Sequence, residues 1–342
     1  MVVAQSRLSS TQQPVCMFVT HYPPFRSYPL LGNPHLQTVL PFFRRARPGG
    51  NPTQCHVVHT ADNDVLVIHD NTPKKWIVGD RIVVLLHGLC GSHRSNYMRR
   101  TAEKLRRNAC RTIRIDMRGQ GDAKYLSRGH AHAAATGDLA SVIQAVQQLS
   151  PLSYITLVGF SLGANIVLRL CGEWKDQPPE QVDSVIAVSP PVDLTFCSGN
   201  LRQWGNRLYD WYFCSQISHA ISDRRQRVPN LIDNGLIRFP SRLVHLDDQF
   251  IAPVNGFRGA RDYYQAASSG PVLRDISLAT LIVASEDDPI VPVSMYDHWV
   301  RSADIEFVKV KRGGHLGFLS STPGDPDRHW LEWRIVRMGQ RF

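Results

Sequence analysis

Apolar and polar residues follow two different periods along this chain. Short apolar runs rich in β-branched residues predict buried strands, at Arg81–His87, Cys110–Asp116, Tyr154–Phe160, Asp183–Ser189, Ala279–Ser285 and Ile305–Lys311. Apolar residues from Leu139 to Leu149 recur at helical spacing instead, and a second helical pattern follows Ser161 directly. Strands that alternate with helices predict an α/β fold, with a mostly parallel sheet and helices on both of its faces. The earlier runs Cys55–His59 and Asp64–His69 predict an antiparallel hairpin at the edge of that sheet.

One connection in this pattern is too long for a loop. The stretch from Ser189 to Ala279 far exceeds the other connections, and a compact domain rarely contains so long a loop without helices or strands of its own. We therefore interpret residues 193–262 as a largely helical segment that caps the sheet, and we call it the insertion. The predicted organisation is a single domain over residues 1–342, with an N-terminal extension over about 1–49 and a core over about 50–192 and 263–342.

The insertion carries two clusters of side chains that bear on the substrate. Aromatic residues gather between Trp204 and Phe213, and Arg224, Arg225 and Arg227 follow them. In one interpretation the aromatic residues form the insertion's own small core and the arginines are solvated. In the other, some of the aromatic residues line a channel for an acyl chain, while the arginines meet an anionic headgroup or a membrane surface.

The composition is that of a globular protein. Of the 342 residues, 43% are hydrophobic and 20% are charged, and no apolar run approaches the length of a membrane-spanning helix. The seven cysteines are scattered and form no Cys-x-x-Cys pair. This usage is typical of reduced thiols rather than of a disulfide framework, and it predicts a cytoplasmic protein.

The net charge of +10 raises the question of an anionic partner. Part of it lies in residues 1–50, where Arg7, Arg26, Arg44, Arg45 and Arg47 are accompanied by no acidic residue. No dense block of lysine and arginine and no recognisable nucleic-acid module is present, which argues against a nucleic-acid partner. A peripheral contact with an anionic membrane and a merely solvated basic surface both remain open.

The strongest local motif is Gly159-Phe160-Ser161-Leu162-Gly163, which has the Gly-x-Ser-x-Gly spacing of a nucleophilic serine. It lies where a predicted strand ends and a helix begins, so the tight turn exposes the Ser161 hydroxyl above the sheet. The first turn of the helix adds N–H groups and a partial positive charge that favour an oxyanion. An ordinary strand–helix turn with a small residue is the alternative.

A serine hydroxyl becomes a good nucleophile only when a base takes its proton. His315 lies in Gly313-Gly314-His315-Leu316-Gly317, directly after the last predicted strand, where flanking glycines allow an imidazole to reach across the sheet. His87 ends a strand and more simply shapes the following loop. His130 and His132 suggest a metal pair, but no third ligand with metal spacing accompanies them. We therefore predict His315 as the base, and no metal or cofactor.

The third member of such a triad orients the imidazole and stabilises its charged form. Asp287 and Asp288 follow the penultimate predicted strand, and both are candidates. The order serine, aspartate, histidine along the chain is one that known triads use.

An oxyanion hole needs two backbone N–H donors. We expect one from Leu162, immediately after the serine, and one from Leu89 in the loop His87–Ser92, whose glycines allow the backbone to approach a substrate closely. A plain turn is the alternative interpretation of that loop.

With these residues identified, the chain resembles the α/β-hydrolase superfamily, and within it the YheT-like branch. The resemblance covers roughly residues 23–335 and includes motifs at Asn33–Thr38, Pro41, Arg44-Arg45, Arg118-Gly119, Gly129–Ala131, Gly137–Leu139, Asp247-Asp248, Ala252-Pro253, Gly256-Phe257 and Asp262–Tyr264. It implies a serine hydrolase that acts on carboxylic esters without a cofactor, with lipid esters as a candidate class. It also favours Asp288, since the family's acid precedes a Pro-x-x-Pro segment. The stretch Gln120–Ala123 departs from the family's pattern, so substrate preference does not carry over.

Together these observations predict a serine esterase or lipase-like enzyme that forms an acyl-enzyme on Ser161. His315 would move the proton, Asp288 would orient the imidazole, and the N–H groups of Leu89 and Leu162 would bind the oxyanion. The expected partner is a small-molecule or lipid ester, medium- or long-chain lipid esters included. Two alternatives share the fold: an acyltransferase with the same triad, and a catalytically idle binding protein.

Overall fold

The computed structural model describes residues 24–43, 53–229 and 240–339. Its strands form one sheet in the order β1-β2-β4-β3-β5-β6-β7-β8. Their bounds are β1 Gln54–His59, β2 Val65–Asn71, β3 Ile82–Leu86, β4 Arg111–Asp116, β5 Ile155–Phe160, β6 Val182–Val188, β7 Ala279–Ser285 and β8 Ile305–Val310. Strands β3 to β8 are parallel, whereas β2 is antiparallel to both β1 and β4. Every predicted strand is therefore confirmed, and so is the hairpin at the sheet edge.

Helices connect these strands and cover the sheet. They are α1 Pro34–Phe43, α2 Asn96–Arg107, α3 Thr136–Leu149, α4 Leu162–Trp174, α5 Leu194–Leu201, α6 Arg207–Arg227, α7 Leu243–Leu246, α8 Ala252–Val254, α9 Ala260–Ala267 and α10 Trp330–Gly339. Shorter turns of helix are η1 Gly121–Ala123, η2 Trp204–Asn206, η3 Asp247–Ile251, η4 Gly270–Asp275 and η5 Val293–His298. Within the described ranges, no helix is both long and apolar enough to cross a bilayer.

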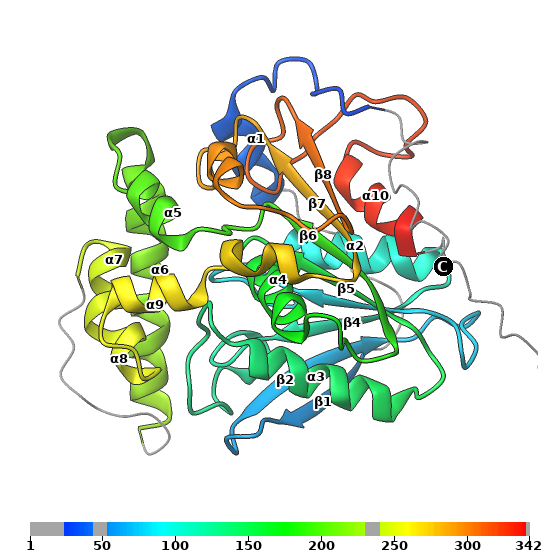
Figure 1. The fold of residues 1–342 in the computed structure, drawn as a ribbon, viewed down its shortest axis with the longest axis horizontal. Helices are drawn as coiled ribbons and strands as arrows, with labels where there is room; N and C mark the ends of the chain where they lie inside the picture. The colour runs from blue at the N-terminus through cyan, green and yellow to red at the C-terminus, as the bar shows by residue number, and fades with distance from the viewer. Residues whose placement is uncertain (1–23, 44–52, 230–239, 340–342) are drawn as a thin grey trace, which may run out of the picture.

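The two faces of the sheet bury separate apolar clusters. Along β3, Ile82, Val84 and Leu86 pack with residues of α3 and α4, while Val83 and Leu85 pack with residues of α2 and α10. This alternation follows from the period of two in a strand, and a strand covered on both faces is apolar throughout. Figure 1 shows helices on both sides of the sheet, as the sequence pattern predicted.

The long connection between β6 and β7 is helical where it is described. Helices α5 to α9 fall in this stretch, and none of its described residues belongs to a strand. Figure 1 shows these helices gathered beside the sheet, at the left of the view. Their apolar residues, among them Leu194, Ile221 and Tyr263, form a third cluster that includes Leu162 at the start of α4. The insertion therefore packs directly against the residue that follows Ser161.

The described part of the N-terminal extension packs against the C-terminal part of the chain. Phe25 lies edge-on to both Phe318 and Trp330, and the Tyr28 N–H donates to the Leu319 carbonyl at 3.1 Å. Helix α1, blue in Figure 1, packs against the loop that follows β8, where Gln37 Nε2 donates to the Leu319 carbonyl at 3.1 Å. The basic residues Arg7, Arg44, Arg45 and Arg47, and the Arg44-Arg45 motif with them, lie outside the described residues.

Candidate active site

Ser161 lies in a strained turn between β5 and α4. Its φ of 51° and ψ of −119° are rare for a residue with a side chain, and such strain is common at functional sites. A Cβ on Gly159 would lie 2.6 Å from the Ala164 nitrogen, and one on Gly163 would lie 2.5 Å from the His87 carbonyl oxygen. The glycines are thus required by the close approach of α4 to the strands, as the tight-turn interpretation predicted.

His315 connects Ser161 with Asp288. Its Nε2 lies 2.9 Å from the Ser161 Oγ, and its Nδ1 lies 2.8 Å from Asp288 Oδ2. Asp288 Oδ1 accepts the N–H groups of Ile290 and Val291, both at 2.9 Å, which fixes the carboxylate. Asp288 and His315 are both buried, with exposures of 7% and 5%.

Of the two aspartates, the structure brings only Asp288 to the imidazole. Asp287 Oδ1 instead accepts the Ser285 hydroxyl and the N–H groups of Gly313, at 3.0 Å, and Gly314, at 2.9 Å. Asp287 therefore holds the backbone of the loop that carries His315. The sequence offered no signal for this role. Asp287 and Asp288 are adjacent residues of the same type, and only the backbone conformation after β7 decides which carboxylate faces the imidazole.

The two expected oxyanion donors lie beside Ser161. Leu89 and Leu162 line the same cavity as the serine, and neither N–H has a hydrogen-bond acceptor among the described residues. A Cβ placed on Gly88 would lie 3.1 Å from the Ser161 Cβ, so the loop of Leu89 passes directly over the hydroxyl. Two free N–H groups next to a nucleophile are what an oxyanion requires.

A cavity of about 100 Å³ opens over Ser161. Because a single water occupies roughly 10–15 Å³ by this measure, the cavity has room for several carbons of an acyl chain. Most of its walls are apolar. The insertion supplies Leu194, Leu201, Phe213, Ile217, Leu243 and Ile251, and the loop after β7 supplies Ile290 and Val291. The aromatic cluster of the insertion is therefore divided: Phe213 lines the cavity, whereas Trp204 and Trp211 are 87% and 59% exposed.

Asp247 is a polar group in the wall of this apolar cavity. It lies in η3, a π-helical turn of the kind that often occurs at functional sites. Its Oδ2 accepts the Tyr264 hydroxyl at 2.6 Å. Burial raises the pKa of Asp247 to about 7, and the nearby carboxylate of Asp210 adds to the rise. In the sequence Asp247 belonged to a family motif, but nothing there placed it in the cavity.

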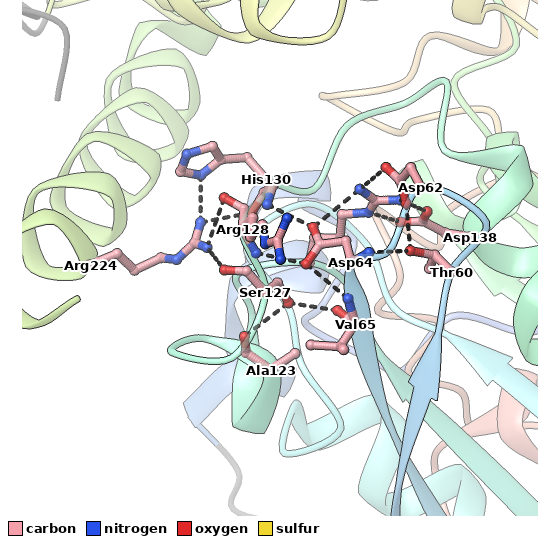
Figure 2. Close-up of polar contacts among 12 residues, drawn as sticks. Thr60, Asp62, Asp64, Val65, Ala123, Ser127, Arg128, His130, Asp138 and Arg224 are labelled. Atoms are coloured by element: carbon pink, nitrogen blue, oxygen red, sulfur yellow. Dashed lines mark hydrogen bonds and ion pairs between the residues drawn. The ribbon is translucent and has the colours of Figure 1, made fainter. Parts of the chain in front are cut away.

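Arg224 has neither of the two roles that the sequence left open. The alternatives were a solvated side chain and one that faces an anionic headgroup, but Arg224 is 1% exposed. Its guanidinium donates to the carbonyls of Lys124, Ser127 and Gly129 at 2.5–2.9 Å, and to His130 Nδ1 at 2.8 Å. Figure 2 shows Arg224 reaching across to this loop from the helix. The long aliphatic stem lets the guanidinium cap carbonyls that would otherwise be buried without donors.

The same loop is held on its other side by Asp64. This carboxylate accepts the N–H groups of Arg128 and Gly129, both at 2.7 Å, and lies 3.1 Å from Arg118 Nη1. Arg118 in turn binds Asp138. In Figure 2, Asp64 and Asp138 lie across this loop from Arg224. The contacts thus join residues of three of the motifs, at Arg118, Gly129 and Asp138. They fix residues 124–130, which lead directly into the cavity-lining Ala131 and Ala133.

Among the described residues, His69, His93, Asp116 and Asp122 have ligand atoms within 4.8 Å of one another. The two imidazole rings, however, are stacked with centroids 3.5 Å apart and planes 20° from parallel. A ring nitrogen binds a metal in the plane of its ring at about 2 Å, so rings in this arrangement cannot both reach one ion. The Arg94 guanidinium also donates to His93 Nε2 and Asp122 Oδ1. We therefore interpret the cluster as a hydrogen-bond network.

Comparison with known proteins gives the family context. The sequence pattern described as the alpha/beta hydrolase fold matches residues 81–322. The chain is 28% identical to YheT of Escherichia coli over 312 residues, which cover 89% of each chain. It is 26% identical to medium-chain fatty acid ethyl ester synthase/esterase 2 of Saccharomyces cerevisiae, covering 76% of this chain and 62% of that protein. It is 24% identical to human monoacylglycerol lipase ABHD2, covering 76% of this chain and 65% of that protein.

Solved structures share the fold at low sequence identity. Est1E from Butyrivibrio proteoclasticus has a TM-score of 0.52 and 15% identity, over 83% of this chain and 96% of that chain. The Pyrococcus furiosus esterase Pf2001 has a TM-score of 0.53 and 18% identity, over 86% of this chain and 94% of that chain. At such identities the likeness shows a common architecture.

Proposed function

The chain belongs to the α/β-hydrolase fold family and is a carboxylic ester hydrolase of its YheT-like branch, and on that premise we propose that Ser161, His315 and Asp288 form its catalytic triad. The observation that carries the proposal is the continuous hydrogen-bonded chain from the Ser161 hydroxyl through His315 to Asp288, at 2.9 and 2.8 Å, at the floor of an apolar cavity.

The chemistry follows from this arrangement. His315 Nε2 takes the hydroxyl proton as Ser161 Oγ bonds to the ester carbonyl carbon, and Asp288 stabilises the imidazolium. The N–H groups of Leu89 and Leu162 bind the carbonyl oxygen as it becomes an oxyanion; in other hydrolases one such donor contributes about 3 kcal/mol. The intermediate collapses, the C–O bond to the alcohol breaks, and the imidazolium protonates the leaving alcohol. Water then attacks the acyl-enzyme by the same route.

Substitution of Ser161 tests the proposal. Ser161→Ala should fold normally and hydrolyse p-nitrophenyl esters at close to the uncatalysed rate. A fluorophosphonate probe should label the native protein and leave this variant unlabelled. If the native protein neither hydrolyses esters nor takes up the probe, the fold serves binding alone and the idle alternative holds.

The apolar cavity favours an acyl chain of medium length as the substrate's buried part. Each methylene that leaves water contributes up to about 0.8 kcal/mol, and the relatives include a protein named for medium-chain esters and one named for monoacylglycerols. We therefore expect kcat/KM to rise from acetate to octanoate esters of one alcohol. A steady decline from acetate onward would show that the cavity does not accept the chain.

A second candidate is acyl transfer, favoured by the name synthase/esterase of the yeast relative. The acyl-enzyme would form identically, and an alcohol would replace water in the second step. Product analysis with added ethanol separates the two: the ethyl ester accumulates if the alcohol is the preferred acceptor, and only free acid forms if it is not.

An exposed apolar surface on the insertion supports contact with an anionic bilayer. Trp204, Leu208 and Trp211 are 87%, 79% and 59% exposed. Leu208 and Trp211 share one side of the start of α6, and Trp204 lies in the turn η2 that leads into it. The exposed Arg202 and Arg207 lie beside them in sequence and complement acidic headgroups. Helices α5 and α6 also line the cavity, so a lipid would have a short path from this surface to the serine.

Vesicle sedimentation tests the membrane contact. The native protein should bind phosphatidylcholine vesicles that contain phosphatidylglycerol, and Trp204→Ala and Trp211→Ala should weaken binding while hydrolysis of a soluble short ester is unchanged. Leu152→Ala, which removes an apolar side chain that is 70% exposed and lies outside the insertion, is the matched control. Failure of the native protein to bind, or a native dimer that the tryptophan variants dissociate, would show that the surface does not contact lipid.

We further propose a cytoplasmic location. The six described cysteines are all free thiols, as in a reducing compartment. Fractionation of cells that express the chain would test the proposal, and recovery from an oxidising compartment would contradict it.

A further inference from the structure

Helix α1 lies directly against the loop that carries His315. The His315 backbone N–H donates to Thr38 Oγ1 at 2.9 Å, and the Thr38 hydroxyl donates to the Pro34 carbonyl at 2.7 Å. Gln37 makes two hydrogen bonds with Leu319: its Nε2 donates to the carbonyl at 3.1 Å, and its Oε1 accepts the N–H at 2.9 Å. Gln37 and Thr38 are 0% and 3% exposed, so these bonds are shielded from water.

The approach of helix and loop is too close for side chains on the loop. Gly314 has a φ of +57°, and a Cβ there would lie 2.7 Å from the Gln37 Cβ and the Pro34 carbonyl oxygen. A Cβ on Gly317 would overlap the Gln37 carbonyl oxygen. The glycines on either side of His315 are therefore explained by backbone packing against α1, and not only by the freedom of the loop.

Successive N–H groups of the loop are held from two sides. Asp287 accepts those of Gly313 and Gly314, and Thr38 accepts that of His315. The hydrogen bonds of the imidazole to Ser161 and Asp288 are made from this fixed backbone. Because buried N–H groups rarely remain unpaired, removing the Thr38 acceptor would force the loop to find a new position.

We propose that Thr38 and Gln37 are positioning residues that set the place of the His315 imidazole relative to Ser161. This inference rests on the proposed function, since it assigns the residues to the same triad. Helix α1 precedes residues 81–322, which match the family pattern, so the extension supplies a part of the active site that the hydrolase core lacks. A misplacement of about 1 Å can reduce turnover by about 100-fold.

The test compares three variants. Thr38→Val removes the hydroxyl and keeps the shape, and it should lower kcat by about 10- to 100-fold with KM within about twofold. Thr38→Ser restores the acceptor and should recover most of kcat. Thr280→Val is the matched control: this buried hydroxyl also donates to a carbonyl, at 2.8 Å, at the start of β7. It should cost stability but leave kcat unchanged.

Rates are measured well below the unfolding temperature of each variant, and Gln37→Met repeats the test at the second contact. The inference would be overturned if Thr38→Val and Thr280→Val had equal kcat. It would also be overturned if the loss of kcat in Thr38→Val were no larger than the fraction of that variant that is unfolded. Failure of Thr38→Ser to recover kcat would do the same. Retained hydrolysis in Ser161→Ala would instead refute the proposed triad, so the two failures are distinguishable.

Discussion

Replacing Arg224 with methionine tests whether the insertion fixes the wall of the cavity. Methionine keeps most of the aliphatic stem and removes the guanidinium. The carbonyls of Lys124, Ser127 and Gly129 would each lose a donor, and His130 would lose its contact at 2.8 Å. Residues 124–130 would keep the Asp64 contacts and the bonds of Lys124 and Tyr125 to Asp223, at 2.7 and 2.6 Å.

The expected cost follows from these contacts. A hydrogen bond to a charged group contributes about 1.5–3 kcal/mol, so the loss of three such bonds costs roughly 5–9 kcal/mol. Removing a buried cation offsets several kcal/mol of this; burial lowers the pKa of Arg224 to about 10, which leaves it charged at neutral pH. We expect a net loss of about 3 kcal/mol, which for a chain of this length lowers the melting temperature by about 4 °C.

Calorimetry measures the loss of stability, and ester hydrolysis on the same samples measures the effect on substrate binding. Arg227→Met is the control, because it makes the same change on the same helix at an exposed side chain, which pairs with Asp223 and lies over the Tyr125 ring but caps none of the three carbonyls. Arg224→Met should melt lower than the control and should raise KM, since the loop leads into the cavity wall. Equal melting temperatures for the two variants would refute the assignment of Arg224 as the residue that holds the loop.

Two further predictions concern acidic residues. Asp288→Asn should reduce kcat by about 10⁴-fold, as loss of a triad carboxylate does elsewhere, whereas Asp287→Asn should cost far less because its amide oxygen still accepts the loop N–H groups; the reverse ranking in steady-state kinetics would contradict the triad. Burial raises the pKa of Asp247 from 3.8 to about 7, so above pH 4 the unfolded chain releases this proton first and native stability falls until about pH 7. Melting curves from pH 4 to pH 8 should therefore show the melting temperature of Asp247→Asn rising relative to that of the native protein as pH increases. A difference in melting temperature that does not change with pH would exclude a destabilising ionisation of buried Asp247.

The central strands were predictable because each is a local apolar run buried on both faces. Ile82–Leu86 and Ala279–Ser285 need no knowledge of their neighbours to be recognised as strands. The tight turn at Ser161 was also predictable from local sequence, since Gly159 and Gly163 lie where α4 approaches the strands too closely for a side chain.

Other features depend on contacts between distant segments. Arg224 and Arg227 look alike in sequence, yet one is buried against a loop about a hundred residues away and the other pairs with Asp223 in the preceding turn. Helix α1 is short and contains Pro41, so the sequence shows no helical period of apolar residues that would predict it. Nothing in the sequence could place Thr38 against His315, because all eight strands of the sheet lie between these two residues along the chain.

Trapping the acyl-enzyme tests the central claim most directly. The protein is mixed with a p-nitrophenyl ester, quenched in acid within milliseconds and digested for mass spectrometry. The proposed mechanism predicts one added acyl group on the peptide that contains Ser161, with faster formation in the native protein than in Asp288→Asn. An acyl group on another residue, or continued hydrolysis with no modification of Ser161, would contradict it.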